Sequence, residues 1–382
     1  MKYQLLAKET TLRNILRECI KREEFTSIDI VNSLNLTKPT VNEALDILRK
    51  DNFIVKENFK KGIVGRKAQV WRTALHNKKS LAIDIDINII KIAIVDMNGN
   101  FYFYKEYDYS IDNSNFLEII KLVVNDYRNN YEEAKDIKRL GISIPGNISF
   151  DRKNILYATN LGLIDINISN LERELNLEIL LENEANSAVL GEFFISKEMD
   201  KNNYMLISIS NFGVGGGQIV DGKLLKGAHR FAGEIGHFTI IMDGEKCACG
   251  NKGCFERYAS YNGLKNLMNK NLINFKTIEE LFESEDEKCK KVIEEYCKIL
   301  GIGLRSLLAI YDSNKIILSG KITNYWNIIY PYIHREIFEN NNFHSQFNIM
   351  IVKSKFEDKS SLIGVGLINF FPYIYFLNNK KN

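Results

Sequence analysis

The sequence is poor in the residues that interrupt a folded chain. Its 382 residues include only 4 prolines and 2 tryptophans, and the 24 glycines form no tract with serine. This excludes a linker-like or disordered chain, which is rich in proline or in polar repeats. With 45% hydrophobic and 26% charged residues the composition is that of a globular protein, and the length favours about two or three domains.

Long apolar runs are also missing. The first 18 residues carry charges every few positions and no apolar core, so we expect no signal peptide and a cytoplasmic protein. The stretch most like a membrane span, residues 361–377, is short and is interrupted by Asn369 and Pro372. We therefore expect a buried helix there, and no membrane partner.

Cysteine is scarce as well, and its six residues are unevenly distributed. Three of them lie within residues 247–254, whereas Cys19, Cys289 and Cys297 lie on apolar helical stripes. Without an export signal, such a cluster favours metal binding over a disulfide scaffold. The three scattered cysteines are expected in the core.

The near-neutral total charge of +3 conceals an asymmetry. Residues 1–80 carry 17 Lys and Arg against 9 Asp and Glu, a net charge of +8, and residues 81–382 carry 34 against 39, a net charge of −5. A basic segment before a slightly acidic body is typical of a nucleic-acid-binding arm on a larger module. A merely lysine-rich surface is the alternative that charge alone leaves open.

Apolar residues recur at helical spacing three times near the N-terminus. The first helix covers residues 12–20. A second carries residues 28–34 and can be capped by Thr26 or Ser27, and a third buries apolar residues between 41 and 48. Three short helices of this kind suit a small DNA-binding domain or, alternatively, a protein-docking domain.

The second and third of these helices form a predicted helix-turn-helix. Asn35 and Leu36 make the turn, Thr37 can cap the third helix, and Pro39 stands in its first turn, where a missing N–H costs nothing. In this motif the start of the second helix of the pair reaches base edges. The predicted DNA contacts in this part are Ser27, Thr37, Lys38, Pro39, Thr40, Asn42 and Glu43.

Residues 53–73 alternate between apolar and polar and predict a two-stranded wing. Its tip, residues 60–67, is basic and glycine-flexed, which suits phosphate or minor-groove contact by Arg66 and Lys67. A winged helix-turn-helix domain over residues 1–75, followed by a linker over 76–80, accounts for the basic charge of residues 1–80.

From residue 81 onward the pattern is strand, strand, strand and helix, with a repeat in the second half. This predicts an α/β organisation with a mixed sheet. The expected elements are strands at 81–88, 89–95 and 101–107, a helix at 115–127, and strands at 140–146 and 204–210.

Five segments of the body form an ordered set of motifs, at residues 84–88, 144–162, 182–186, 213–217 and 232–256. In this order they resemble the ROK family of repressors, open reading frames and kinases. The resemblance covers nearly all of residues 81–377 and implies a two-lobed actin-like ATPase (ribonuclease H-like) fold for residues 81–382. With the N-terminal domain, the whole chain resembles the ROK transcriptional repressors, which include xylose repressors and regulators of glucose and N-acetylglucosamine use.

The last segment contains a metal-binding pattern that stands without the family. His237, Cys247, Cys249 and Cys254 give the spacing H-x9-C-x-C-x4-C. Three thiolates and one imidazole make a closed tetrahedral set for structural Zn²⁺, with Gly250 and Gly253 allowing the tight turns. Free thiols near a histidine are the alternative.

Six positions match sugar-contacting residues of the family. Carboxylates and amides read polyols through paired hydrogen bonds, although most Glu and Asn side chains in proteins are merely solvated. His237 would serve twice, with one ring nitrogen on zinc and the other on a sugar hydroxyl. The predicted sugar contacts are Asn160, Asn183, Glu184, Glu234, His237 and Glu256.

The phosphate-binding motifs of the family's kinases differ here in three places. Asp86 stands at a glycine position and sets a carboxylate where a phosphate would bind. Phe212 replaces a threonine, and Glu184 replaces the aspartate that acts as general base. We therefore expect no phosphoryl transfer. Residual sugar kinase activity is the alternative.

Glu184 also bears on the choice of sugar, since a Glu at this position resembles xylose repressors. Its longer side chain could fill the volume left by a missing hydroxymethyl group, which favours a pentose over a hexose. The expected function is a sugar-responsive repressor, a homodimer or a tetramer, released from operator DNA when xylose closes the cleft between the two lobes. A regulator that responds to glucose or N-acetylglucosamine is the alternative.

Overall fold

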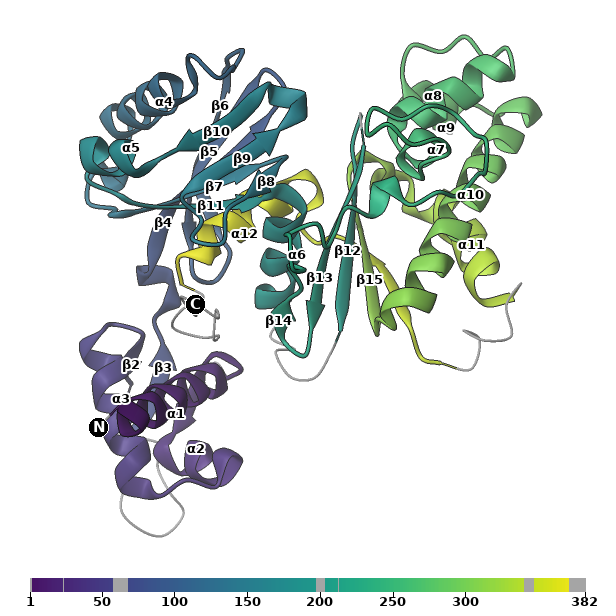
Figure 1. Cartoon of the computed structure of the whole chain (residues 1–382). Coiled ribbons are helices and arrows are strands. Elements are labelled where there is room, and N and C mark those ends of the chain that lie inside the picture. Colours follow the sequence, from purple (N-terminus) through teal and green to yellow (C-terminus); the bar gives the residue numbers. More distant parts are fainter. Residues whose placement is uncertain are drawn as a thin grey trace. The chain divides into compact units, whose positions relative to one another are not determined.

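The computed structural model describes residues 2–22, 24–57, 68–196, 203–211, 213–339 and 347–370, with side chains from residue 9 onward. The chain divides into two compact units, each described by itself (Figure 1). The first unit comprises Met1–Glu182, Phe193–Met199 and Leu362–Asn382, and the second comprises Asn183–Glu192 and Asp200–Ser361.

The N-terminal part of the first unit is a winged helix. Three helices pack around buried Ile15, Ile30 and Val41, as the helical spacing predicted. The expected wing strands pair antiparallel, and a strand that the pattern did not reveal joins them in the order β1-β3-β2. The elements are α1 (Lys2–Ile20), β1 (Glu24–Thr26), α2 (Ser27–Leu34), α3 (Lys38–Lys50), β2 (Ile54–Lys56) and β3 (Val70–Thr73).

The two helix caps differ from each other. Thr26 caps α2 with a complete capping box, in which its side chain accepts from the backbone N–H of Asp29 and the Asp29 carboxylate accepts from the backbone N–H of Thr26. The prediction that Thr37 caps α3 was wrong in its chemistry. Thr37 stands at the cap position, but its hydroxyl pairs with that of Thr40 at 2.9 Å and makes no cap hydrogen bond.

The main sheet of the first unit has the strand order β11-β7-β4-β5-β6. Ile83 and Ile92 of the sheet share one core with Ile120 and Val124 of a covering helix. A smaller sheet of β8, β9 and β10 adjoins this core. The strands are β4 (Lys79–Asp86), β5 (Ile89–Asp96), β6 (Phe101–Asp108), β7 (Arg139–Ile144), β8 (Asn147–Ile148), β9 (Asn154–Ala158), β10 (Leu163–Asn167) and β11 (Glu178–Asn183), and the helices are α4 (Phe116–Asn130), α5 (Ser169–Leu175) and α12 (Ser360–Ile368).

The start of β4 corrects the expected linker. Lys79 and Ser80 belong to the strand, where they pair with Asp96 and Val95, and Ser80 is buried with its hydroxyl donating to the carbonyl of Gly366. The apolar pattern missed this because Lys79 and Ser80 are polar. The division of the chain at residues 75 and 80 otherwise stays a prediction.

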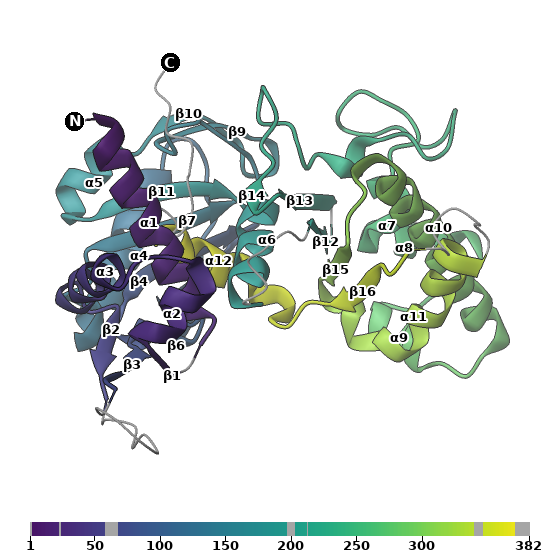
Figure 2. The same cartoon turned by 90° about the horizontal axis from the view of Figure 1, so that it is seen from below.

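The second unit repeats the same sheet topology in the order β14-β13-β12-β15-β16. Ile207 and Ile316 of this sheet pack with Leu300 and Leu304 of the long helix α10, which lies beside α11 (Figure 2). The strands are β12 (Tyr204–Ile209), β13 (Val214–Val220), β14 (Lys223–Leu224), β15 (Lys315–Ser319) and β16 (Met350–Lys353), and the helices are α6 (Glu184–Ile195), α7 (Glu256–Ala259), α8 (Tyr261–Lys270), α9 (Ile278–Glu283), α10 (Glu287–Tyr311) and α11 (Trp326–His334).

The two main sheets are built alike. In each, the first strand along the chain is central, the second and third continue antiparallel from it, and the fourth pairs parallel on its other side. This confirms the expected mixed sheet and its repetition. Within the described residues no helix is long and apolar enough to cross a membrane. Cys19, Cys289 and Cys297 are buried, as expected.

Three glycines of the run 213–217 lie inside β13, which other segments approach closely. A Cβ on Gly217 would lie 2.3 Å from the carbonyl oxygen of Ala185 in α6, and one on Gly216 would lie 2.6 Å from Cδ1 of Ile235. Because contacts this short exclude a side chain, Gly216 and Gly217 serve the close packing of β13.

Candidate functional site

The predicted metal ligands come together in the second unit. His237 ends the short 3₁₀ helix η4 (Ile235–His237), and the three cysteines lie between it and α7. One ligand atom from each residue lies within 4.8 Å of all the others. The cluster found by spacing in the sequence is therefore also a cluster in space.

Two of the distances within the cluster fit a zinc ion. Cys249 Sγ and Cys254 Sγ are 3.6 Å apart, and Cys247 Sγ is 3.6 Å from Nδ1 of His237. Tetrahedral zinc, with bonds of about 2.0–2.3 Å, separates neighbouring ligand atoms by about 3.4–3.8 Å. The donor set and the spacing thus suit a closed Cys₃His site with no position for water.

The loop that carries the cysteines depends on two glycines. Gly250 and Gly253 have φ angles of 92° and 70°, which side chains rarely adopt. A Cβ on Gly253 would lie 1.7 Å from the carbonyl oxygen of Ile241. The close approach at Gly253 lets Cys254 return to the cluster, where it also forms a β-bridge with Thr239.

The two ring nitrogens of His237 face different groups. Nδ1 faces Cys247 and lies 3.6 Å from Oε1 of Glu256, whereas Nε2 lies 3.8 Å from Oε2 of Glu234. The Cys247 thiol donates to Oε1 of Glu256 at 3.0 Å. One nitrogen therefore points to the metal cluster while the other points to a carboxylate that was predicted to bind sugar.

Glu234 and Glu256 lie on either side of this imidazole. Burial raises the pKa of Glu234, the His237 ring opposes that shift, and the charge of Glu256 adds to it. The structure thus brings three of the six predicted sugar-contacting side chains into one polar group with hydrogen-bond acceptors for hydroxyls.

Asn183 and Glu184 lie where β11 runs into α6. The Asn183 side chain accepts from the backbone N–H of Asn186 at 3.1 Å and so holds the first turn of the helix. The hydroxyl of Ser208, in β12, donates to Oε1 of Glu184 at 3.4 Å. Sequence reasoning missed Ser208, because no local pattern connects residues 24 positions apart.

Asn160 belongs to the other unit. It lies in the 3₁₀ helix η3 (Thr159–Leu161) with an exposed side chain, whereas the remaining five predicted sugar contacts lie in the second unit. That Asn160 meets them on one sugar stays a prediction.

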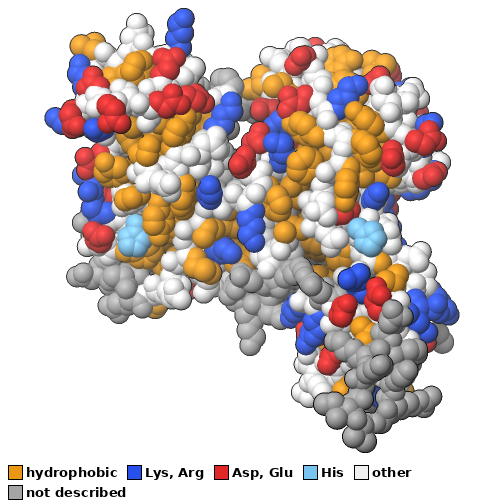
Figure 3. Space-filling model, turned by 180° about the vertical axis from the view of Figure 1, so that it is seen from behind, with side chains coloured by type: hydrophobic (Ala, Val, Ile, Leu, Met, Phe, Trp, Pro, Cys, Tyr) orange, Lys and Arg blue, Asp and Glu red, His pale blue; other side chains and the backbone are white. Residues whose placement is uncertain are grey.

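The predicted DNA-contacting side chains that the structure describes are all accessible to solvent. Lys and Arg side chains, interspersed with acidic ones, are visible on the winged helix in Figure 3. Arg66 and Lys67 lie outside the described residues. None of the others is buried: Ser27, Thr37, Lys38, Pro39, Thr40, Asn42 and Glu43.

Two of the three altered kinase positions, Glu184 and Asp86, lie within the described residues. Asp86 ends β4 with an exposed side chain, and its Oδ1 accepts from the backbone N–H of Ile87 at 2.7 Å. The Asp86 carboxylate thus accepts the hydrogen bond of the Ile87 backbone N–H. In a phosphate-binding turn such an N–H donates to the phosphate instead. Phe212 lies outside the described residues.

Comparison with known proteins identifies the family. The model of the ROK family matches residues 80–369. The chain belongs to the ROK family. Its fold is the mixed α/β, actin-like fold with an N-terminal helical domain that the sequence predicted. A solved ROK family transcriptional regulator, a homologue of the E. coli MLC protein, superposes with a TM-score of 0.82 at 21% identity and covers 96% of this chain and 97% of its own.

Within the ROK family the chain is similar to both regulators and kinases. The xylose repressor of Caldicellulosiruptor bescii is 26% identical over 380 residues, which cover 94% of this chain and 95% of that protein. The glucokinase of Halalkalibacterium halodurans is 29% identical over 212 residues, which cover 50% of this chain and 64% of that protein. The first of these alignments leaves out only 6% of this chain and therefore includes most of the winged helix.

Proposed function

We propose that this ROK protein is a sugar-responsive transcriptional repressor. The alignment with a xylose repressor along 94% of the chain carries the proposal, because it includes the N-terminal domain. The winged helix adds support, since the start of α3 presents polar and basic side chains to solvent.

The DNA-binding residues proposed are those at the starts of α2 and α3, with Arg66 and Lys67 on the wing. A homodimer would place two α3 helices about 34 Å apart, in successive major grooves of a palindromic operator. Lys38 and the wing residues neutralise phosphates, whereas Thr40 and Asn42 read base edges.

The proposed effector is xylose, and the proposed location of the protein is the cytoplasm. Six side chains would hydrogen-bond the hydroxyls of xylose, so that bound sugar favours one arrangement of the two units: Asn160 from one unit, and Asn183, Glu184, Glu234, His237 and Glu256 from the other. To change operator binding from mostly bound to mostly free, the sugar must favour the released state by roughly 5 kcal/mol.

The metal proposed is structural Zn²⁺ on His237, Cys247, Cys249 and Cys254. Bound there, it supplies no reacting group, because all four positions are protein ligands. It fixes the loop that carries Glu234 and Glu256, and it leaves Nε2 of His237 free to face the sugar.

A two-step experiment tests the function. Random duplexes selected on the full-length protein supply an operator, and fluorescence anisotropy then measures its affinity during titration with xylose, glucose or N-acetylglucosamine. We expect xylose to weaken operator binding at least about tenfold and the hexoses to have a smaller effect. Operator affinity that no sugar changes would refute the repressor mechanism.

Glu184 provides the test of sugar choice. Glu184→Asp shortens the side chain by one methylene, which should relax discrimination against glucose by about 1–3 kcal/mol, or roughly tenfold in relative affinity. Asp221→Asn, on the exposed turn after β13, is the control. A preference for xylose that Glu184→Asp leaves intact would remove the steric explanation.

Kinase activity is the second candidate, favoured by the glucokinase alignment over half of this chain. Coupled measurement of ADP release with a panel of sugars tests it. We expect no turnover from the native protein. Turnover above the rate without sugar would establish the kinase, and Asp86→Gly would then raise it, since the substitution removes a carboxylate from the phosphate position.

A further inference from the structure

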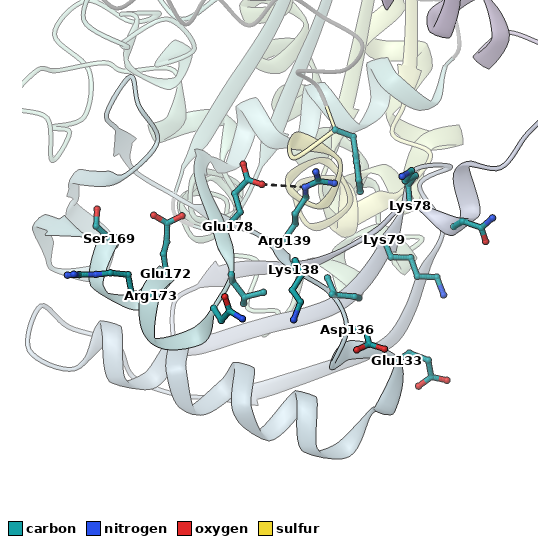
Figure 4. A pocket seen from close by; sticks show the side chains of 15 residues that line it. Lys78, Lys79, Glu133, Asp136, Lys138, Arg139, Ser169, Glu172, Arg173 and Glu178 are labelled. Carbon is teal, nitrogen blue, oxygen red and sulfur yellow. Dashed lines mark hydrogen bonds and ion pairs between the residues drawn. The ribbon is translucent and has the colours of Figure 1, made fainter. Parts of the chain in front are cut away.

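The first unit contains an open depression of about 1010 Å³ that lies apart from the residues assigned to DNA, sugar and metal. It is lined by three segments that are distant in sequence: the exit of the winged helix at 77–79, the turn before β7 at 133–139, and α5 with the start of β11 at 169–178 (Figure 4). Phe370 completes the lining.

When the ion-paired side chains are set aside, more basic than acidic side chains remain in the lining of this depression. Glu178 pairs with Arg139 at 3.4 Å, and Glu172 pairs with Lys153, outside the lining, at 2.6 Å. Among the described residues, the lining cations with no carboxylate in ion-pair contact are Lys78, Lys79, Lys138 and Arg173, against Glu133 and Asp136 on the acidic side.

Lys78 is the most constrained of these cations. It is half-buried, its ammonium lies over the Phe53 ring at 4.6 Å from the centroid, and no carboxylate of the described residues is within ion-pair distance. Burial lowers the pKa of Lys78, the neighbouring Arg139 charge lowers it further, and Asp51 opposes the shift. Lys78 and Arg139 are neighbouring cations, and Arg139 has a carboxylate contact, with Glu178, at the long distance of 3.4 Å. A bound anion is electrostatically favoured beside them, where it would share Arg139 with Glu178.

Lys78 also connects the winged helix to the body. Phe53 precedes β2 of the winged helix, and its carbonyl accepts from the backbone N–H of Ala74 at 2.8 Å. On the other side, the Lys78 carbonyl accepts from the backbone N–H of Met97, at the end of β5, at 2.9 Å. A ligand that draws the Lys78 side chain off Phe53 would therefore act on this junction.

We propose that the depression is a second effector site, which binds a small phosphate dianion, free or as a monoester, between Lys78 and Arg139 and weakens the junction to the winged helix. Arg139 offers a guanidinium, which suits phosphate oxygens, and stacks on Phe370 with its carbon Cζ 5.6 Å from the ring centroid. Binding of the anion is independent of the proposed function. Its effect on operator DNA rests on that function.

Thermal unfolding of the full-length protein at constant ionic strength tests the binding step. Inorganic phosphate, glycerol phosphate and sulfate are titrated against chloride. We expect a saturable rise in melting temperature with both phosphates, and an apparent affinity about tenfold weaker in Lys78→Gln. Lys78→Arg keeps the charge and should keep most of the effect. The two phosphate probes distinguish the free ion from a monoester.

The winged helix itself can bind phosphate, so a variant there is the matched control. Lys50→Gln, exposed at the end of α3, should leave the rise unchanged. An equal rise in melting temperature in Lys78→Gln and in the native protein would refute the proposed site. Loss of the rise in Lys50→Gln alone would also refute it and would place the ion on the DNA-binding face.

Operator affinity at constant ionic strength tests the coupling. Phosphate should weaken operator binding about threefold in the native protein, the scale of one lost cation–π contact, and should leave Lys78→Gln unaffected. Equal changes in both proteins would overturn the coupling even where phosphate binds. A protein that binds no operator would refute the proposed repressor instead, and the melting experiment would still decide the anion site.

Discussion

At the scale of single residues, the cysteines fall into two classes that a metal analysis can separate. Cys254→Ser removes one of four ligands and should lose the bound zinc, with a loss of stability because structural zinc contributes on the order of 10 kcal/mol to folding of its segment. Cys289→Ser changes a buried cysteine of α10 and should keep one zinc per chain. Elemental analysis of purified protein gives the answer, and zinc retained by Cys254→Ser would exclude the four-ligand site.

A buried ion pair is a second feature at this scale. Arg152 donates through Nε and Nη2 to Oε2 of Glu182, at 3.1 and 2.8 Å, and both side chains are buried. Arg152→Met removes the guanidinium that neutralises the buried Glu182 carboxylate and should destabilise the first unit by about 3–5 kcal/mol in urea denaturation. The double variant with Glu182→Met should recover most of that loss. If the double variant is no more stable than Arg152→Met, the two side chains contribute more to folding than the neutralisation of each other's charge.

At the scale of elements, the two threonines at helix starts make a matched pair. Thr26→Ala removes the capping box of α2 and should destabilise that helix by about 1 kcal/mol. Thr37→Ala removes no cap bond and should change stability far less. Hydrogen exchange of the α2 and α3 backbone amides measures both, and equal loss of protection in the two variants would contradict the assignment.

The glycines of β13 offer a second comparison between neighbours. Gly217→Ala would place a Cβ 2.3 Å from the Ala185 backbone, whereas Gly215→Ala would place it 3.3 Å from the Ala185 side chain. We expect a loss of about 1–3 kcal/mol for the first and a smaller loss for the second. Because α6 begins with predicted sugar contacts, Gly217→Ala should also weaken sugar binding in calorimetry. Unchanged stability and affinity would mean that α6 can move away at little cost.

At the scale of the whole molecule, the charge asymmetry predicts how DNA binding depends on salt. The net charge of +8 over residues 1–80 implies several phosphate contacts per dimer. If six or more are made, operator affinity should fall about 10³-fold or more between 50 and 200 mM salt, because condensed counterions are released. Anisotropy measurements at several salt concentrations give the slope. A flat dependence would favour the alternative of a protein-docking domain.

The winged helix and the metal site were largely readable from the sequence. Helical spacing placed the three N-terminal helices, because their apolar positions follow one face. The H-x9-C-x-C-x4-C pattern placed the metal cluster, because all four ligands lie within 18 residues and the glycines between them permit the turns. The prediction failed at Thr37, because its hydroxyl pairs with the Thr40 hydroxyl instead of capping a backbone N–H of α3.

What the sequence determined by itself was therefore local or repeated: helices and strands through their periods, the cluster of candidate metal ligands through its spacing, and the ROK family through its motifs. Tertiary structure alone decided which distant groups meet. It joined Ser208 to Glu184, directed the two nitrogens of His237 at different partners, and placed Lys78 and Arg139 in the lining of one depression. Such contacts depend on how strands and helices pack, and no period or spacing along the chain records that packing.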